Sequence, residues 1–146
     1  MWNLCVQSLG AASDGRLRAL ELFRKARVQT QLRHLWHSLI GRRATLRVLD
    51  HPRLPGGRGL GRMAVPVAEI VGSEGRAGDF DRHFGPLTDR ARDRWLSVAL
   101  ARQHGIPLPP VVLLRAADGY YVRDGHHRIS VARALGEAYV EAEVVG

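Results

Sequence analysis

The pattern that most constrains the fold lies in residues 111–145, where short apolar segments alternate with turn residues. Residues 111–115 and 120–123 are rich in β-branched and aromatic side chains and flank a turn sequence, Ala-Asp-Gly, at 117–119. A helix is expected to follow over about 126–135. The order hairpin then helix is typical of an α+β domain, in which a small mixed sheet is covered by flanking helices.

The chain around this region predicts further elements of the same domain. Residues 139–145 alternate polar and apolar side chains, as a strand with one buried face does. A helix is expected over about 88–103, with Thr88 as its N-cap. Its apolar face would comprise Ala91, Trp95, Val98 and Ala99. Residues 63–67 are expected to form a strand, and the polar, glycine-rich segment 72–81 a loop.

The N-terminal third carries most of the positive charge. A helix, or a pair of helices, is expected from about Asp14 to Arg43, with Ser13 or Asp14 as the cap. Apolar residues recur there at helical spacing, namely Leu17, Leu20, Phe23, Leu32, Leu35, Trp36 and Leu39. From Arg16 to Arg43 there are eight basic residues and one acid, Glu21, a balance of 8 − 1 = +7 in a chain of net charge +8. Such a basic amphipathic helix can pack on its own domain, or lie along nucleic acid, a membrane surface or a partner.

A change in composition separates this helix from the rest. Residues 45–49 are a short strand candidate, and residues 52–62 are rich in proline and glycine, which is typical of a loop or linker. The sequence therefore predicts three parts: a basic helical segment over 1–44, a strand and linker over 45–62, and the α+β domain over 63–146.

Composition places the chain among intracellular globular proteins. Its 146 residues are enough for a core without disulfides, and the single cysteine, Cys5, excludes an internal disulfide. No apolar run approaches the ~18 residues of a membrane span. The N-terminus lacks the basic and apolar regions of a secretory signal. We therefore expect a cytoplasmic protein without a transmembrane segment.

Residues 124–128 read Asp-Gly-His-His-Arg and stand between the second hairpin strand and the helix that follows. We call them the DGHHR box. Gly125 allows close approach of the backbone to a ligand, and a helix start offers N–H groups and partial positive charge to a phosphate. Further donors at this helix start would come from His126, His127, Arg128 and Ser130. The box therefore predicts a phosphate site.

The DGHHR box in this order of elements resembles the ParB/sulfiredoxin-like superfamily. In that superfamily a Gly-x-x-Arg box opens a helix and contacts nucleotide phosphates. Residues 106–112 are similar to its helix-to-strand entry, and residues 120–124 are similar to the strand before its box. Arg76, followed by Phe-Asp at 80–81, is similar to a second element of the family. The resemblance covers roughly residues 65–145 and not the N-terminal third.

Differences within the superfamily narrow what the resemblance implies. The box is similar to the Asp-Gly-His-Thr-Arg box of free serine kinases, with His127 in the place of threonine. Sulfiredoxins have a cysteine in the box, whereas the cysteine of this chain is Cys5. Chromosome-partitioning ParB proteins have a glutamate at the place of His126 and a helix-turn-helix module after the domain. The resemblance thus implies phosphate-bond transfer or hydrolysis rather than sulfinic acid reduction.

We assign roles to the candidate residues on this basis. Phosphate or nucleotide binding is expected of Arg76, Gly125, His126, His127, Arg128 and Ser130. Asp124 and His126 are the expected catalytic residues, because a carboxylate beside a phosphate is useful as an acid/base or as a Mg²⁺ ligand. Adjacent histidines are a poor metal pair. Mg²⁺ would instead arrive with a nucleoside di- or triphosphate, near the carboxylates of Glu69, Glu74, Asp79, Asp81 and Asp124.

Two alternatives follow from other features. The basic segment 16–43 is compatible with DNA binding, as in a partition-accessory protein or a ParB-like nuclease. A toxin or effector module with the same fold is a third reading. Positive charge focused at the box favours a nucleotide, whereas charge spread continuously from the N-terminal segment over one face favours nucleic acid.

Overall fold

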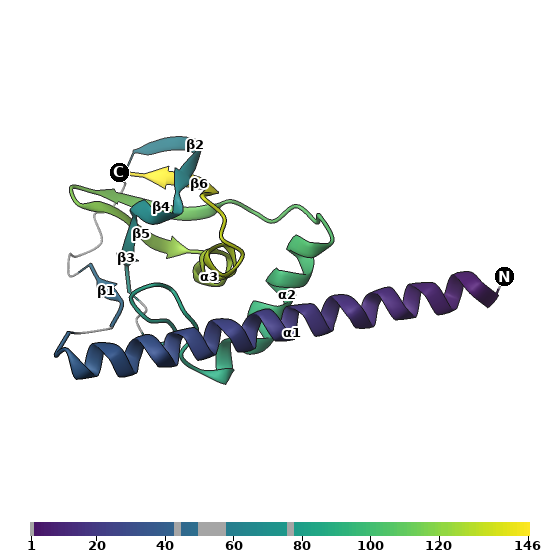
Figure 1. Cartoon of the computed structure of the whole chain (residues 1–146). Helices are drawn as coiled ribbons and strands as arrows, with labels where there is room; N and C mark the ends of the chain where they lie inside the picture. The colour runs from purple at the N-terminus through teal and green to yellow at the C-terminus, as the bar shows by residue number, and fades with distance from the viewer. Residues whose placement is uncertain (1, 43–44, 50–57, 76–77) are drawn as a thin grey trace.

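The computed structural model describes residues 2–42, 45–49, 58–75 and 78–146, with side chains from Ser13 onward (Figure 1). Its strands are β1 (Arg47–Val48), β2 (Gly59–Pro66), β3 (Ile70–Ser73), β4 (Val111–Ala116), β5 (Gly119–Asp124) and β6 (Tyr139–Val145). Its α-helices are α1 (Trp2–Leu39), α2 (Arg92–Gln103) and α3 (His126–Ala134), with the 3-10 helices η1 (Val67–Glu69) and η2 (Asp89–Ala91). In these ranges no helix is both long and apolar enough to cross a membrane.

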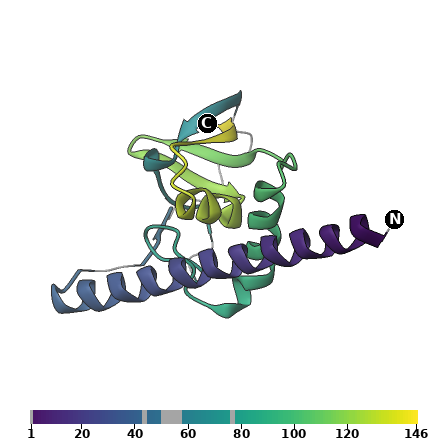
Figure 2. The same ribbon diagram turned by 45° about the vertical axis from the view of Figure 1, so that its right-hand side comes forward.

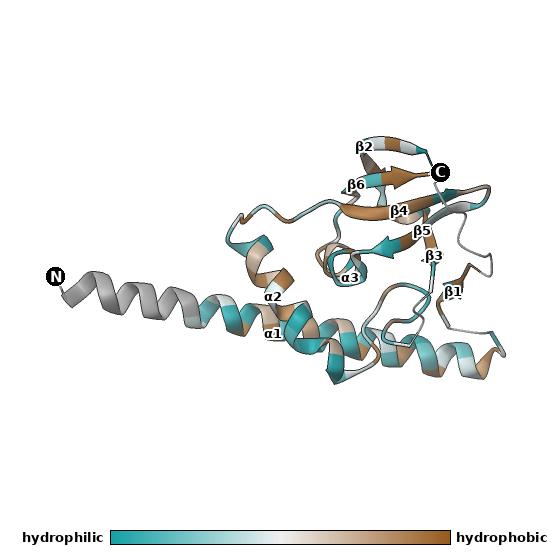
Figure 3. Cartoon of the chain, turned by 180° about the vertical axis from the view of Figure 1, so that it is seen from behind, coloured by the Kyte–Doolittle hydropathy of each residue, from teal (hydrophilic) through white to brown (hydrophobic). Residues whose placement is uncertain are grey.

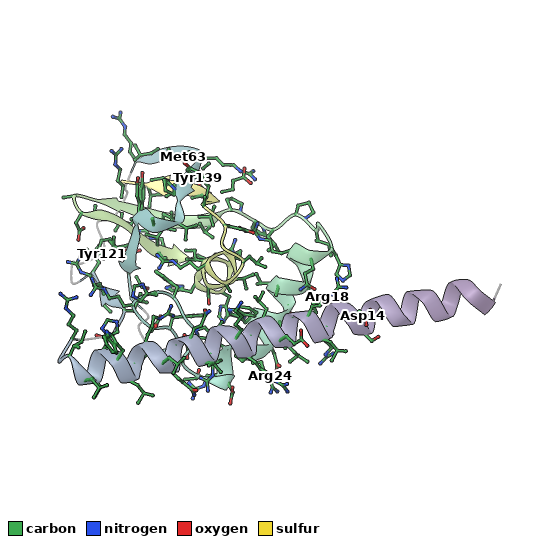
Figure 4. The ribbon with its side chains drawn as sticks, viewed as in Figure 1. Asp14, Arg18, Arg24, Met63, Tyr121 and Tyr139 are labelled. Atoms are coloured by element: carbon green, nitrogen blue, oxygen red, sulfur yellow. The ribbon has the colours of Figure 1, made fainter. Side chains whose placement is uncertain are left out.

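The described strands form one mixed sheet in the order β1-β3-β5-β4-β6-β2. The hairpin β4–β5 and the pair β2–β6 are antiparallel, whereas β4–β6, β3–β5 and β1–β3 are parallel. Along β6, Val140, Ala142 and Val144 are buried and alternate with exposed residues, so the sheet buries one face, as predicted. Met63 of the edge strand β2 and Tyr139 of the neighbouring β6 are both exposed (Figure 4). The α+β class with a mixed sheet and flanking helices is confirmed.

The helices cover the buried face of the sheet in two layers. Figure 2 shows α3 between the sheet and α1, with α2 beside it. Trp95 of α2 is completely buried; its ring meets the ring of Phe23 of α1 edge-on, with 5.3 Å between centroids. Its indole N–H donates a hydrogen bond to Ser130 Oγ of α3 at 2.9 Å. One core therefore joins all three helices to the sheet.

The N-terminal helix differs from the prediction in length and in buried face. It is continuous from Trp2, so Ser13 and Asp14 lie inside it rather than at its cap. It ends at Leu39, before Gly41 with a φ of 67°. Its buried residues are Ala19, Phe23, Ala26 and Thr30. Phe23 is the buried member of the predicted apolar stripe. The exposed members, which lie on a different side of the helix from the buried residues, are Leu17, Leu32, Leu35, Trp36 and Leu39.

A loop over residues 80–87 fixes α1 to the domain. The buried carboxylate of Asp81 accepts hydrogen bonds from the backbone N–H groups of His83 (2.9 Å) and Gly85 (2.7 Å). Arg33 of α1 lies 3.3 Å from the same carboxylate. A Cβ on Gly85 would lie 2.0 Å from Oγ1 of Thr30, so the loop backbone packs directly on the helix.

Several predicted boundaries are wrong. β2 begins at Gly59 inside the predicted linker, because pairing with β6 overrides the weak strand preference of glycine. β1 is shorter than residues 45–49, and β3 occupies the start of a predicted loop. Thr88 precedes η2 instead of capping α2; its hydroxyl donates to Asp79 Oδ1 at 3.4 Å. The division into parts 1–44, 45–62 and 63–146 stays a prediction.

Candidate functional site

Gly125 forms the junction between β5 and α3. It has a φ of 105° and a ψ of 23°, a left-handed conformation that side chains disfavour. A Cβ there would lie 2.6 Å from Cγ1 of Val111 on β4. Glycine also provides no side chain to cap the first-turn N–H groups of α3. The sequence thus needs glycine here, and the helix start is left uncapped by its N-cap residue.

A cavity of about 610 Å³ opens at this helix start. It lies where the carboxyl ends of the parallel strands β3 and β5 meet the first turn of α3 and one side of α2. Its lining comprises Ser73, Glu74, Gly75, Asp79, Phe80, Arg94, Val98, Val122, Arg123, Asp124, Gly125, His126, His127 and Arg128. This size is within the range of small-molecule and cofactor sites. The whole DGHHR box is part of the wall.

His126 is held from two sides. Its Nε2 is hydrogen-bonded to Oγ of Ser73, the last residue of β3, at 2.6 Å. Its ring lies nearly parallel to the ring of Phe80, with 6.2 Å between centroids. Ser73 is completely buried, and its hydroxyl also lies 3.5 Å from the carbonyl oxygen of Val122. The orientation of the imidazole is therefore set by the neighbouring strand.

Ser73 is a site residue that sequence reasoning missed. The strand that positions it is only Ile-Val-Gly-Ser, directly before a polar, glycine-rich segment. Parallel pairing with β5 places the end of β3 beside the box. The two β-branched residues Ile70 and Val71 were the signal available in the sequence.

His127 is half-buried and contacts the same phenyl ring. Its ring meets Phe80 edge-on, with 5.2 Å between centroids. Burial lowers the pKa of His127 below its ordinary value; Arg94 lowers it further, and Asp79 raises it. The lowered pKa favours the neutral imidazole, which presents one donor and one acceptor.

The guanidinium of Arg128 is engaged with the domain itself. Its Nη1 donates to the carbonyl oxygens of Pro109 (2.5 Å) and Pro110 (2.9 Å), just before β4. Its Nη2 donates to Oδ2 of Asp124 at 2.8 Å. The side chain is only 14% exposed, whereas that of Asp124 is 70% exposed. Arg128 thus ties the first turn of α3 to the segment that enters β4.

Positive and negative groups alternate around the cavity. Arg123 makes a two-pronged ion pair with Glu74, at 2.6 and 3.1 Å, which raises the pKa of Arg123. Arg94 and Asp79 line the wall without joining that pair. Positive charge at this cavity is therefore balanced by carboxylates rather than focused at the box alone. Carboxylates beside arginines suit a phosphate that arrives with a cation.

Other predicted site residues lie elsewhere. The hydroxyl of Ser130 is buried and accepts from Trp95, so it belongs to the core rather than to the cavity lining. Asp81 is used to fix α1, and Glu69 belongs to η1. Arg76 lies outside the described residues. The described part of the chain contains no group of three or more histidine, cysteine or acidic side chains placed to hold a metal ion.

Comparison with known proteins gives distant structural matches. No family model and no curated protein sequence matches the chain. Two solved structures align with 68% of it: a free serine kinase in complex with AMP (17% identity, TM-score 0.43) and a mutant of that kinase, also with AMP (15%, 0.42). The aligned region spans 36% of each kinase chain. Similarity at this level assigns neither a family nor an activity, so the ParB/sulfiredoxin-like resemblance stays a prediction.

Proposed function

We propose that the cavity binds a nucleoside di- or triphosphate with its phosphates at the start of α3, and that the domain transfers or hydrolyses a phosphate bond. The observation that carries this proposal is the Gly125-led, uncapped start of α3, which opens into a cavity of about 610 Å³. The N-terminal end of a helix favours an anion through its N–H groups and its dipole.

The lining of the cavity combines apolar and hydrogen-bonding groups, as a nucleotide site requires. Phe80, Val98 and Val122 are its apolar members, against which a base or sugar can pack. Arg94 and neutral His127 provide donors close to the helix start. The N–H groups of Arg128 that are not bound to Pro109, Pro110 or Asp124 are further donors.

The carboxylates fit a magnesium ion that is carried in by the phosphates. Glu74, Asp79 and Asp124 all line the cavity. Two of them are paired with arginines, and Mg²⁺ in phosphate sites is usually held by one or two carboxylates together with phosphate oxygens and waters. Asp79 is the ligand we assign, which leaves Asp124 as the acid/base candidate. When bound, the ion would neutralise charge on the transferred phosphoryl group.

The protein groups for chemistry are Asp124 and His126. Asp124 is exposed in the cavity wall and is the acid/base candidate for an acceptor hydroxyl or water. His126, oriented by Ser73, stands beside it at the helix start and can hold or move a proton at its second ring nitrogen.

Calorimetric titration with ATP, ADP, CTP and GTP in the presence of Mg²⁺ tests the proposal. Gly125→Ala should weaken binding at least about ten-fold, because the new Cβ meets Val111 and strains the helix start. Gly136→Ala is the matched control: it introduces similar strain (φ 71°) at the other end of α3, where a Cβ meets no atom within 4 Å. Absence of binding of every nucleotide by the folded original protein would contradict the proposal.

No specific observation favours the DNA-binding alternative. Arg27 donates to the carbonyl oxygen of Leu87, and Arg33 pairs with Asp81, so two cations of α1 serve contacts within the domain.

A further inference from the structure

A row of apolar side chains lies on the outer side of α1. Val28, Leu32, Leu35 and Leu39 are 52%, 60%, 64% and 82% exposed. Their spacing of four, three and four residues places them on one side of the helix, as in the seam of a coiled coil. This side is distinct from the side that carries Ala19, Phe23, Ala26 and Thr30 into the core. Figure 3 shows hydrophobic residues along this C-terminal half of α1.

A groove of about 570 Å³ runs beside this row, between α1 and the segment Pro86-Leu87. Its α1 wall is formed by Arg27, Thr30, Gln31, His34, Leu35 and Ser38. Leu35 belongs to both the row and the groove, so the two form one continuous surface. Nε2 of His34 is buried and has no hydrogen-bond partner within the described residues.

Basic side chains stand at both ends of the row. Arg24 and Lys25 precede it and Arg42 follows it, and all three are exposed. Figure 4 shows Arg24 on the side of α1 that faces away from the sheet. Within this stretch, from Arg24 to Arg42, the sequence contains no acidic residue. A partner with acidic groups at both ends of an apolar row would be complementary in charge.

This charge pattern argues against a second copy of the chain as the occupant. If two rows met antiparallel, with Leu32 opposite Leu35, the Arg24–Lys25 end of one row would lie beside the Arg42 end of the other copy. If they met in parallel, Lys25 would face its own counterpart. Both arrangements bring like charges together at the seam, which disfavours the pairing.

We propose that the row and the adjoining groove bind an acidic amphipathic helix from another protein. The row spans about 16 Å, or roughly three helical turns. The partner helix would place apolar residues at i, i+4, i+7 and i+11 against the row. Aspartate or glutamate would face Arg24, Lys25 and Arg42. This inference rests on α1 and the loop over 80–87, and it is independent of the nucleotide site.

A fluorescein-labelled set of 18-residue acidic amphipathic peptides tests this, with leucine at the seam positions and glutamate beside them. Binding to the full chain is followed by fluorescence polarisation. We expect micromolar binding that weakens as salt rises. Leu35→Gln should weaken it at least ten-fold, and Lys25→Glu should weaken it and reduce its salt dependence. Leu17→Gln is the matched control, because Leu17 is 58% exposed on α1 outside the row and its substitution should change nothing.

The outcomes distinguish the possible occupants. If none of the peptides binds, or if peptides with lysine in place of glutamate bind as tightly, the proposal is wrong. Sedimentation that shows a dimer abolished by Leu35→Gln would instead assign the surface to a second copy. If the protein instead floats with phosphatidylglycerol vesicles, if Leu35→Gln abolishes this flotation, and if no peptide binds, the surface would be assigned to a membrane. Unchanged circular dichroism of each variant establishes that α1 is still folded.

Discussion

The hydroxyl of Ser73 lies 2.6 Å from Nε2 of His126, which links the end of β3 to the first residue of α3. The two residues are far apart in the sequence and meet only because β3 pairs in parallel with β5. A histidine held in this way has a defined ring orientation, and its second nitrogen has a defined place relative to the helix start. Ser73 is therefore a positioning residue in the proposed phosphate site.

Replacing Ser73 with alanine should release the imidazole of His126. We expect the ring to change tautomer or pKa, visible in its NMR signals, and turnover to fall several-fold with little change in nucleotide affinity. The loss of a buried hydrogen bond should also cost about 1 kcal/mol of stability. Ser97→Ala, which removes an exposed hydroxyl that donates within α2, is the control. Unchanged His126 signals would contradict this role for Ser73.

Substitution of Asp124 by asparagine should separate binding from turnover. A carboxylate repels a bound phosphate, so the variant should bind metal-free nucleotide as well as the original or better. It should turn over about 10²–10⁴-fold more slowly if Asp124 is the acid/base. The broken pair with Arg128 should cost little stability, because Asp124 is largely exposed. Turnover within two-fold of the original would mean that Asp124 only holds Arg128.

Acidification should lower the free energy of unfolding, and the titration of His127 should contribute to this loss. Burial keeps its folded pKa below the unfolded value, so the unfolded chain binds the proton more tightly. The stabilisation is complete above about pH 6.5 and is lost as the pH falls through the folded pKa. Urea denaturation at pH 7.5 and 5 should show a smaller decrease in unfolding free energy for His127→Gln than for the original. His104→Gln, at an exposed residue, should decrease like the original; an equal decrease in all three proteins would exclude His127 as the cause.

Asp81→Ala should loosen the contact between α1 and the domain. It leaves two backbone N–H groups and Arg33 without their buried acceptor, which should cost about 2–3 kcal/mol. Chemical denaturation measures this loss, with Asp93→Ala at a 94% exposed side chain as the control. A loss equal to that of the control would show that Asp81 does not anchor α1.

The sequence predicted those elements that have a clear hydrophobic period or a strong turn or glycine signal. The alternation of β6, the turn between β4 and β5, and the glycine at the start of α3 all have local causes, and the structure has each of them. β3 was not recognised because a strand of four residues in a glycine-rich context has almost no period. Ser73 was missed for the same reason.

The hydrogen-bond partners of individual donor side chains could not be predicted from their spacing in the sequence. Arg128 and Ser130 both follow the helix start, yet Arg128 binds the carbonyls of Pro109 and Pro110, and Ser130 binds Trp95. These partners lie 18 to 35 residues away in the sequence, and only the packing of α3 against α2 and β4 brings them together. The buried side of α1 was likewise decided by tertiary contacts, with Trp95 of α2 and with the loop over residues 80–87.

Backbone amide NMR during a titration with ATP and Mg²⁺ tests the central claim most directly. If the start of α3 binds phosphate, the amide signals of His126, His127 and Arg128 should shift progressively and saturate. The signals of Gly125 and Ser73 should shift by smaller amounts. The signals of exposed α1 residues such as Leu32 and Leu39 should stay in place. Absence of any shift in the first turn of α3 at millimolar ATP, or shifts confined to α1, would contradict a phosphate site at the DGHHR box.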